Sequence, residues 1–125
     1  MNKRKTGQQY EDKAAAYLEK CGFTILERNF RCRQGEVDLI GLHENCLVFV
    51  EVKYRKNAAA GTPEEAVGII KQQKICQVSD YYRLMHPKRE ERQIRYDVIA
   101  FCGEQITWYR NAFPYLKKGS PGVFW

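Results

Sequence analysis

Apolar residues recur along the chain with two different periods, and these periods predict where its helices and strands lie. Between residues 9 and 21, apolar or small side chains recur every three or four positions, which is typical of a helix with one buried face. A second helix is predicted to begin at Pro63, with Thr62 as its N-cap, and to end before Pro87. Its expected buried stripe consists of Val67, Ile70, Ile75, Val78, Tyr81, Tyr82 and Met85.

Five stretches rich in β-branched and aromatic residues are predicted to be strands. They cover residues 23–30, 36–42, 46–54, 94–102 and 105–109. Glu44 and Asn45 suit a turn between the second and third strands, and Gly103 with Glu104 suits a turn between the last two. The resulting order is αβββαββ, which predicts an α/β protein with a mixed central β-sheet flanked by helices.

Composition indicates a small globular protein with a polyanionic partner. Of 125 residues, 44% are hydrophobic and 29% are charged, so we expect one domain over residues 1–116 and a C-terminal tail over residues 117–125. Lys and Arg exceed Asp and Glu by 21 to 15, a net charge of +6. No apolar run approaches the roughly 20 residues of a membrane span, and no apolar stretch follows the basic start. We therefore expect a cytoplasmic protein without a membrane partner.

The cysteines do not suggest a disulfide framework or a zinc ribbon. There are five, and no two are spaced as Cys-x-x-Cys, so most are expected to be small core residues. His43 with Cys32 and Cys46 is an alternative set of three metal ligands. Because His43 falls in a predicted turn, we favour a surface position for it.

Charged residues interrupt the most apolar predicted strand. Glu51 and Lys53 are two positions apart and therefore point to the same face of the sheet. If the hairpin closes with a two-residue turn at residues 44–45, or with a four-residue loop of the same register, Asp38 faces Glu51. A three-residue loop would shift the pairing by one position. Two facing carboxylates repel each other, and a divalent cation would relieve that repulsion.

These residues predict a metal site that cleaves phosphodiesters. Mg²⁺ prefers oxygen ligands, so Asp38 and Glu51 are the predicted ligands and the Val52 carbonyl is a third. The Lys53 ammonium would orient a water or offset charge on the phosphate. The alternative is a solvated face with an ion pair between Lys53 and Glu36. We favour the metal site because both carboxylates lie in the most apolar part of their strands.

Four segments together resemble the YraN-like family of small bacterial proteins. They are GEVDLI at residues 35–40, LVFVEVKYR at residues 47–55, KQQK at residues 71–74 and RYDVIAF at residues 95–101. That family is similar to archaeal Holliday junction resolvases and belongs with the restriction-endonuclease-like nucleases. The resemblance implies a restriction-endonuclease-like core, dependence on Mg²⁺ with Mn²⁺ as a substitute, and a DNA substrate, including branched DNA.

The resemblance also assigns expected roles to individual residues. Asp38, Glu51 and Lys53 match the nuclease motif, and Glu11 matches an additional acidic residue of the resolvases. Arg95 and Asp97 match a family feature, which we interpret as an internal ion pair. The residues predicted to bind nucleic acid flank the hairpin or lie on the second helix: Arg31, Arg33, Arg55, Lys56, Lys71 and Lys74.

Three functions are consistent with these observations. The first is a Mg²⁺-dependent endonuclease for structured DNA, for which a homodimer is attractive because a junction has two strands to cut. The alternative is a non-catalytic DNA-binding module that retains the nuclease fold. The third is a protein-interaction domain, and the facing carboxylates Asp38 and Glu51 count against it.

Overall fold

The computed structural model describes residues 3–55, 67–87 and 92–117. Its elements are α1 (Lys3–Lys20), β1 (Thr24–Cys32), β2 (Gly35–His43), β3 (Cys46–Arg55), α3 (Ile69–Met85), β4 (Gln93–Cys102) and β5 (Gln105–Tyr109). The predicted order αβββαββ is confirmed. Beyond its first residue, the predicted C-terminal tail lies outside the described residues. None of the described helices is long and apolar enough to cross a membrane.

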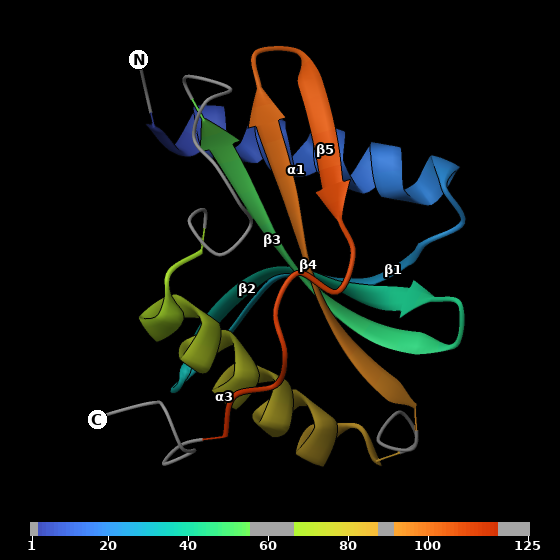
Figure 1. Ribbon diagram of the computed structural model, residues 1–125, viewed down its shortest axis with the longest axis vertical. Coiled ribbons are helices and arrows are strands. Elements are labelled where there is room, and N and C mark those ends of the chain that lie inside the picture. Colours follow the sequence, from blue (N-terminus) through green and yellow to red (C-terminus); the bar gives the residue numbers. More distant parts are fainter. Residues whose placement is uncertain (1–2, 56–66, 88–91, 118–125) are drawn as a thin grey trace.

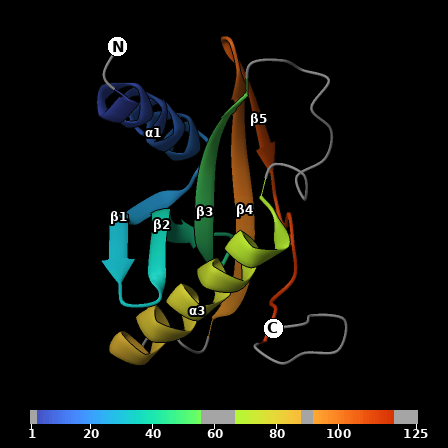
Figure 2. The ribbon, with the colours of Figure 1, turned by 90° about the vertical axis from the view of Figure 1, so that its left-hand side faces the viewer.

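The strands form one mixed sheet in which the order in space follows the order in sequence. β3 and β4 are parallel, whereas the other neighbouring strands are antiparallel. Figures 1 and 2 show α1 and α3 on opposite sides of this sheet. The mixed sheet flanked by helices is therefore confirmed, and its arrangement is consistent with a nuclease-like fold.

β3 is buried on both faces, which explains its nearly continuous apolar sequence. Val48 and Val50 belong to the core beneath α1, together with Leu18. Leu47 and Phe49 point to the other face and belong to the core beneath α3. Glu51 continues the second series by the alternation of side chains along a strand. A carboxylate is therefore placed at the edge of the α3-side core.

The β2–β3 turn has the predicted two residues. Glu44 and Asn45 both have left-handed backbone angles, with φ of 50° and 65°, as a type I′ hairpin turn requires. His43 pairs with Cys46, and Ile40 pairs with Phe49. The predicted register is thus confirmed through these pairs.

The second helix differs from the prediction at its start and in its exposed residues. Thr62 and Pro63 lie outside the described residues, but α3 begins only at Ile69, after Gly68 as its N-cap. Ile70 and Met85 are 60% and 59% exposed, and Tyr81 is also at the surface. The prediction of a buried stripe through these three residues was wrong.

Two polar residues on the buried face of α3 explain that error. Gln72 is buried and donates a hydrogen bond of 2.7 Å to the Val67 carbonyl. Ser79 is buried and shares a hydrogen bond of 2.7 Å with the Tyr96 hydroxyl. Because both side chains are hydrogen-bonded, the helix can turn them inward at little cost. The core face therefore cannot be found from apolar residues alone.

His43 is buried rather than at the surface, contrary to the prediction. It occupies the last position of β2, and only 5% of it is exposed. Its ring packs 5.0 Å from the Trp108 ring, and its Nδ1 lies 3.0 Å from Arg95 Nη2. Within the described ranges, no three His, Cys, Asp or Glu side chains gather closely enough to bind one metal ion, so the alternative site with Cys32 and Cys46 is absent there.

Gly41 of β2 provides a stability prediction, because a side chain has no space there. A Cβ atom at this position would lie 2.1 Å from Phe23 Cε1 and 2.3 Å from the Thr24 carbonyl oxygen. We expect Gly41→Ala to lower the free energy of unfolding in urea by about 2–3 kcal/mol. Gly7→Ala is the control, since nothing lies within 4 Å of the added Cβ, and should not destabilise the protein. Equal effects of the two substitutions would contradict the close packing.

Candidate functional site

Asp38 lies where β2 and β3 begin to separate. The last residue pair between these strands is Leu39 with Val50, so continuing the register by one position places Asp38 opposite Glu51. The Val52 backbone N–H donates a hydrogen bond of 2.8 Å to Asp38 Oδ2. The half-buried Asp38 carboxylate therefore reaches across to β3 and is fixed beside Glu51.

Glu51 is a buried acidic residue with one unsatisfied oxygen. Only 5% of the residue is exposed, and its Oε2 has no hydrogen-bond partner among the described residues. Burial, and after it the hydrogen bond and the negative charge of Asp38, raise the pKa of Glu51 to about 9. Asp38 and Glu51 thus form a strongly interacting carboxylate pair.

Two lysines compensate part of this negative charge. Lys71, in the first turn of α3, places its Nζ 3.5 Å from Glu51 Oε2, which is within the range of an ion pair. The ammonium groups of Lys71 and Lys53 both lower the pKa of Glu51, but less than burial and Asp38 raise it. The environment of Glu51 therefore disfavours its charged form, and a further cation beside the pair would favour that form.

Glu11 on α1 lies close enough to Asp38 for their charges to interact. Burial raises the pKa of Glu11, and the Asp38 charge raises it further, whereas Arg28 and a hydrogen bond from Asn29 lower it. Its Oε1 is buried and has no hydrogen-bond partner among the described residues. Three acidic residues thus follow one another in the order Glu11, Asp38, Glu51, although they do not converge on one point.

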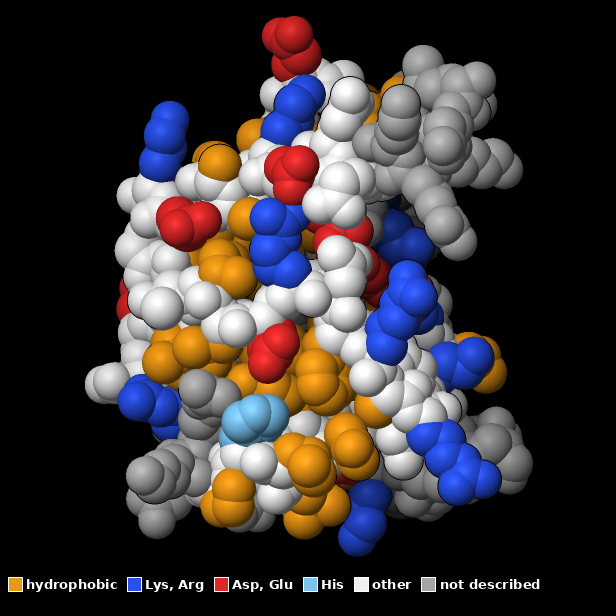
Figure 3. Space-filling view, turned by 180° about the vertical axis from the view of Figure 1, so that it is seen from behind, with side chains coloured by type: hydrophobic (Ala, Val, Ile, Leu, Met, Phe, Trp, Pro, Cys, Tyr) orange, Lys and Arg blue, Asp and Glu red, His pale blue; other side chains and the backbone are white. Residues whose placement is uncertain are grey.

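The predicted nucleic-acid-binding residues lie in different places. Lys71 joins the carboxylate pair. Arg31 is exposed, pairs with Glu36 at 3.0 Å and lines a surface depression together with Glu11. Arg33 is exposed in the β1–β2 turn, Arg55 ends β3, and Lys74 lies exposed on α3. Lys56 is outside the described residues. Figure 3 shows one face on which Lys and Arg lie among acidic side chains, a few of them recessed and others protruding.

The Arg95–Asp97 ion pair is confirmed, and both side chains are largely buried. Arg95 Nη2 is 2.9 Å from Asp97 Oδ2, and the Asp97 side chain is fully buried. Trp108 Nε1 and the Asn111 backbone N–H also donate to this carboxylate. These contacts tie β4 to β5 and to the segment behind it, which is a structural role.

Sequence reasoning missed one group of polar residues on the same face as Glu51. Gln105, Thr107 and Tyr109 alternate along β5, and the pairing of β5 with β4 places them on the α3 side. Their spacing of two residues was a signal that they share one face of the strand. That spacing alone does not say which face they share, because the answer depends on how β4 pairs with β3.

The fold and the site define an α/β protein of nuclease-like fold, with a carboxylate pair at the edge of its central sheet. The profile of the Uncharacterised protein family UPF0102 matches residues 10–101. The chain belongs to this family, the YraN-like family suggested by its motifs.

Relatives from several bacteria match nearly the whole chain. A UPF0102 protein from Lachnoclostridium phytofermentans is 45% identical, covering 90% of this chain and 96% of the relative. One from Caldanaerobacter subterraneus is 46% identical, covering 90% and 98% respectively. One from Photobacterium profundum is 42% identical, covering 89% and 91%. The likeness thus extends over all the elements that build the site.

Proposed function

We propose that this protein is a Mg²⁺-dependent endonuclease that hydrolyses phosphodiester bonds of DNA, with branched DNA as the preferred substrate. The observation that carries the proposal is the buried carboxyl group of Glu51 beside Asp38, whose Oε2 has an ion pair with Lys71 but no hydrogen-bond partner among the described residues. A homodimer would present two such sites to the two strands of a junction.

The residues of the site suit a divalent cation with oxygen ligands. Mg²⁺ in proteins often uses one or two carboxylates and keeps several waters, so Asp38 and Glu51 suffice as side-chain ligands and the Val52 carbonyl is a third candidate. The unfavourable burial of negative charge at Glu51 is what a bound cation would relieve. Bound there, Mg²⁺ or Mn²⁺ would act as a Lewis acid and make a coordinated water more acidic.

The two lysines complete the proposed chemistry. Lys53 follows Glu51 by two positions on β3, so its ammonium points to the same face and would orient the attacking water or offset charge on the phosphate. Lys71 already pairs with Glu51 and would move its charge towards the phosphate when a cation takes its place. Glu11, next to Asp38, would hold a second water through its unsatisfied Oε1.

The basic surface supports a nucleic-acid substrate. The chain carries a net charge of +6, and Arg31, Arg33 and Arg55 lie on the strands or turns beside the carboxylate pair. Neutralisation of phosphates by such residues supplies most of the sequence-independent affinity for DNA. An acidic site surrounded by basic residues is suited to a phosphodiester that needs a metal ion for cleavage.

One observation favours the alternative of a non-catalytic DNA-binding module. Asp38 accepts a hydrogen bond from Val52, and Glu51 forms an ion pair with Lys71, so both carboxylates have partners without a metal ion. These contacts would stabilise the fold in a protein that only holds DNA.

Cleavage assays distinguish the two functions. Labelled junction, flap and linear DNA would be incubated with Mg²⁺ or Mn²⁺ and with the wild type, Glu51→Ala or the control Glu36→Ala, which removes an exposed carboxylate paired with Arg31. We expect cutting by the wild type and the control, and a loss of at least about a hundredfold in Glu51→Ala. Equal cutting by all three would reject the site. Binding without cutting, with a steep dependence on salt, would support the binding module.

A further inference from the structure

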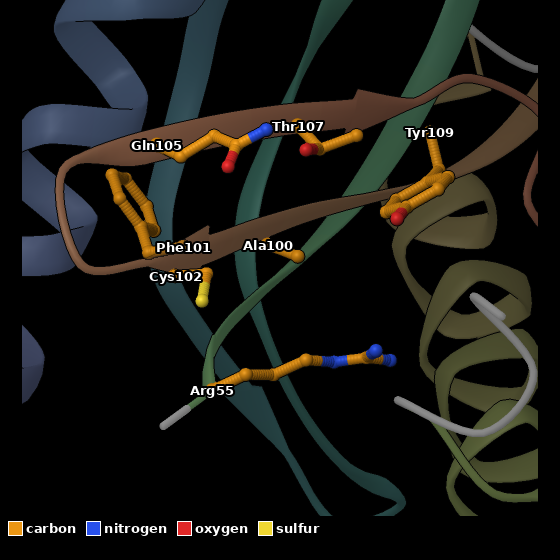
Figure 4. A pocket seen from close by; sticks show the side chains of 7 residues that line it. All are labelled: Arg55, Ala100, Phe101, Cys102, Gln105, Thr107 and Tyr109. Atoms are coloured by element: carbon orange, nitrogen blue, oxygen red, sulfur yellow. The ribbon is translucent and has the colours of Figure 1, made fainter. Parts of the chain in front are cut away.

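A polar pocket lies at the end of β3 and over β4 and β5, on the side of the sheet that α3 covers. Its lining consists of Arg55, Ala100, Phe101, Cys102, Gln105, Thr107 and Tyr109. Figure 4 shows the Arg55 side chain extending from the end of β3, while Gln105, Thr107 and Tyr109 follow one another along β5. Among these lining residues none is acidic, and Arg55 supplies the positive charge.

Strand register connects this pocket to the proposed catalytic residues. Glu51 pairs with Val98, which pairs with Tyr109. Lys53 is likewise in line with Thr107 across β4 through Ala100. Because residues paired across a sheet point to the same face, these side chains share one surface with the carboxylate pair.

Arg55 is in line with Gln105 through Cys102, one step farther along the same surface. Alternate residues of a strand are about 6.6 Å apart, so Glu51, Lys53 and Arg55 follow one another at steps of that size. This spacing is close to that of successive phosphates in an extended nucleic-acid strand. A strand cut at Glu51 and Lys53 would thus bring its next phosphates towards Arg55.

The chemistry of the pocket suits a phosphate and its sugar. Arg55 can donate two parallel hydrogen bonds to phosphate oxygens. Gln105, Thr107 and Tyr109 are neutral donors, and their side chains have no hydrogen-bond partner among the described residues. Thr107 and Tyr109 are half-buried. A ligand bound there would be partly shielded from water, which strengthens its hydrogen bonds and its attraction to Arg55.

We propose that this pocket binds the backbone of the nucleic-acid strand next to the phosphate that is cut, so that the strand runs along β3 from Glu51 towards Arg55 and contacts β5. The proposal rests on the proposed function for the direction of the strand. It adds a binding subsite formed by Arg55, Gln105, Thr107 and Tyr109, which would hold a single strand independently of the metal ion.

Binding without metal tests this subsite separately from cleavage. Fluorescence anisotropy of a labelled single-stranded oligonucleotide would be measured in EDTA with the wild type, Arg55→Gln, Thr107→Val and the control Arg92→Gln. Arg92 is exposed just before β4, at the opposite end of that strand from the pocket, and its substitution removes the same charge as Arg55→Gln. Urea unfolding would verify that each variant is folded.

We expect Arg55→Gln to weaken binding about tenfold and to reduce the slope of affinity against salt by about 1. Thr107→Val should weaken binding about fivefold, the value of one hydrogen bond, without changing that slope. Arg92→Gln should change the logarithm of the dissociation constant by less than half as much as Arg55→Gln does.

Equal losses in Arg55→Gln and Arg92→Gln, together with wild-type binding by Thr107→Val, would overturn the subsite. Its failure is distinguishable from that of the proposed function. Binding that follows the expected order in a protein that never cuts DNA would support the subsite and reject the endonuclease. Mg²⁺-dependent cutting that is lost in Glu51→Ala but unchanged in Arg55→Gln and Thr107→Val would support the endonuclease and reject the subsite.

Discussion

Glu51→Gln is expected to stabilise the metal-free protein at pH 8 while removing its response to Mg²⁺. The pKa of Glu51 is raised from its ordinary value of 4.5 to about 9, so the folded state binds a proton more tightly than the unfolded state. Stability from this group is therefore fully present below pH 4.5 and is lost as the pH rises towards 9. A neutral amide of similar shape avoids that loss.

The expected gain is on the order of 5 kcal/mol at pH 8 and about 1 kcal/mol at pH 5, because pH 8 lies about 3.5 units above the ordinary pKa and each unit corresponds to about 1.4 kcal/mol. Urea unfolding of both proteins in EDTA at the two pH values measures it. Addition of Mg²⁺ should then stabilise the wild type but not the variant, since a ligand that binds only the folded state stabilises it. A variant that is less stable than the wild type at both pH values would show that Glu51 is a structural residue.

Asp97→Ala is expected to lower the free energy of unfolding by about 3–5 kcal/mol, the largest loss of stability predicted for this protein. The Asp97 side chain is fully buried and accepts hydrogen bonds from Arg95, Trp108 and the Asn111 backbone. Its removal leaves the guanidinium of Arg95 and two N–H groups without their acceptor inside the protein.

Urea unfolding at neutral pH measures this loss, with Asp12→Ala as the control. Asp12 also forms an ion pair with an arginine, Arg28, but at the surface, where such pairs contribute little. We expect the control to unfold close to the wild type. A loss for Asp97→Ala no greater than that for Asp12→Ala would contradict a central role of the buried pair.

The parts of the fold that follow from local rules could be predicted from the sequence. The turn at Glu44 and Asn45 fixes the register of β2 and β3, because a shift by one residue would turn the apolar side chains of both strands to the wrong face. From that register, the neighbourhood of Asp38 and Glu51 follows without further information. The Arg95–Asp97 pair could be expected because a charge buried in an apolar strand is costly unless an opposite charge pairs with it.

The remaining features depend on contacts between segments distant in sequence. The buried face of α3 includes Gln72, whose hydrogen bond to the Val67 carbonyl is visible only in the structure. His43 is buried because β4 and β5 bring Arg95 and Trp108 to it. The pocket at β5 depends on the parallel register of β3 and β4. No turn fixes that register, since parallel strands are joined by a long crossover.

The central claim is that Asp38 and Glu51 together bind a divalent metal ion. A Mn²⁺ titration followed by electron paramagnetic resonance tests it most directly, because bound Mn²⁺ loses the sharp signal of the free ion. The wild type should bind Mn²⁺ at a single class of site that Mg²⁺ competes for, and both Asp38→Asn and Glu51→Gln should abolish this binding. Equal Mn²⁺ binding by the wild type and both variants, or no binding by any of them, would contradict the claim.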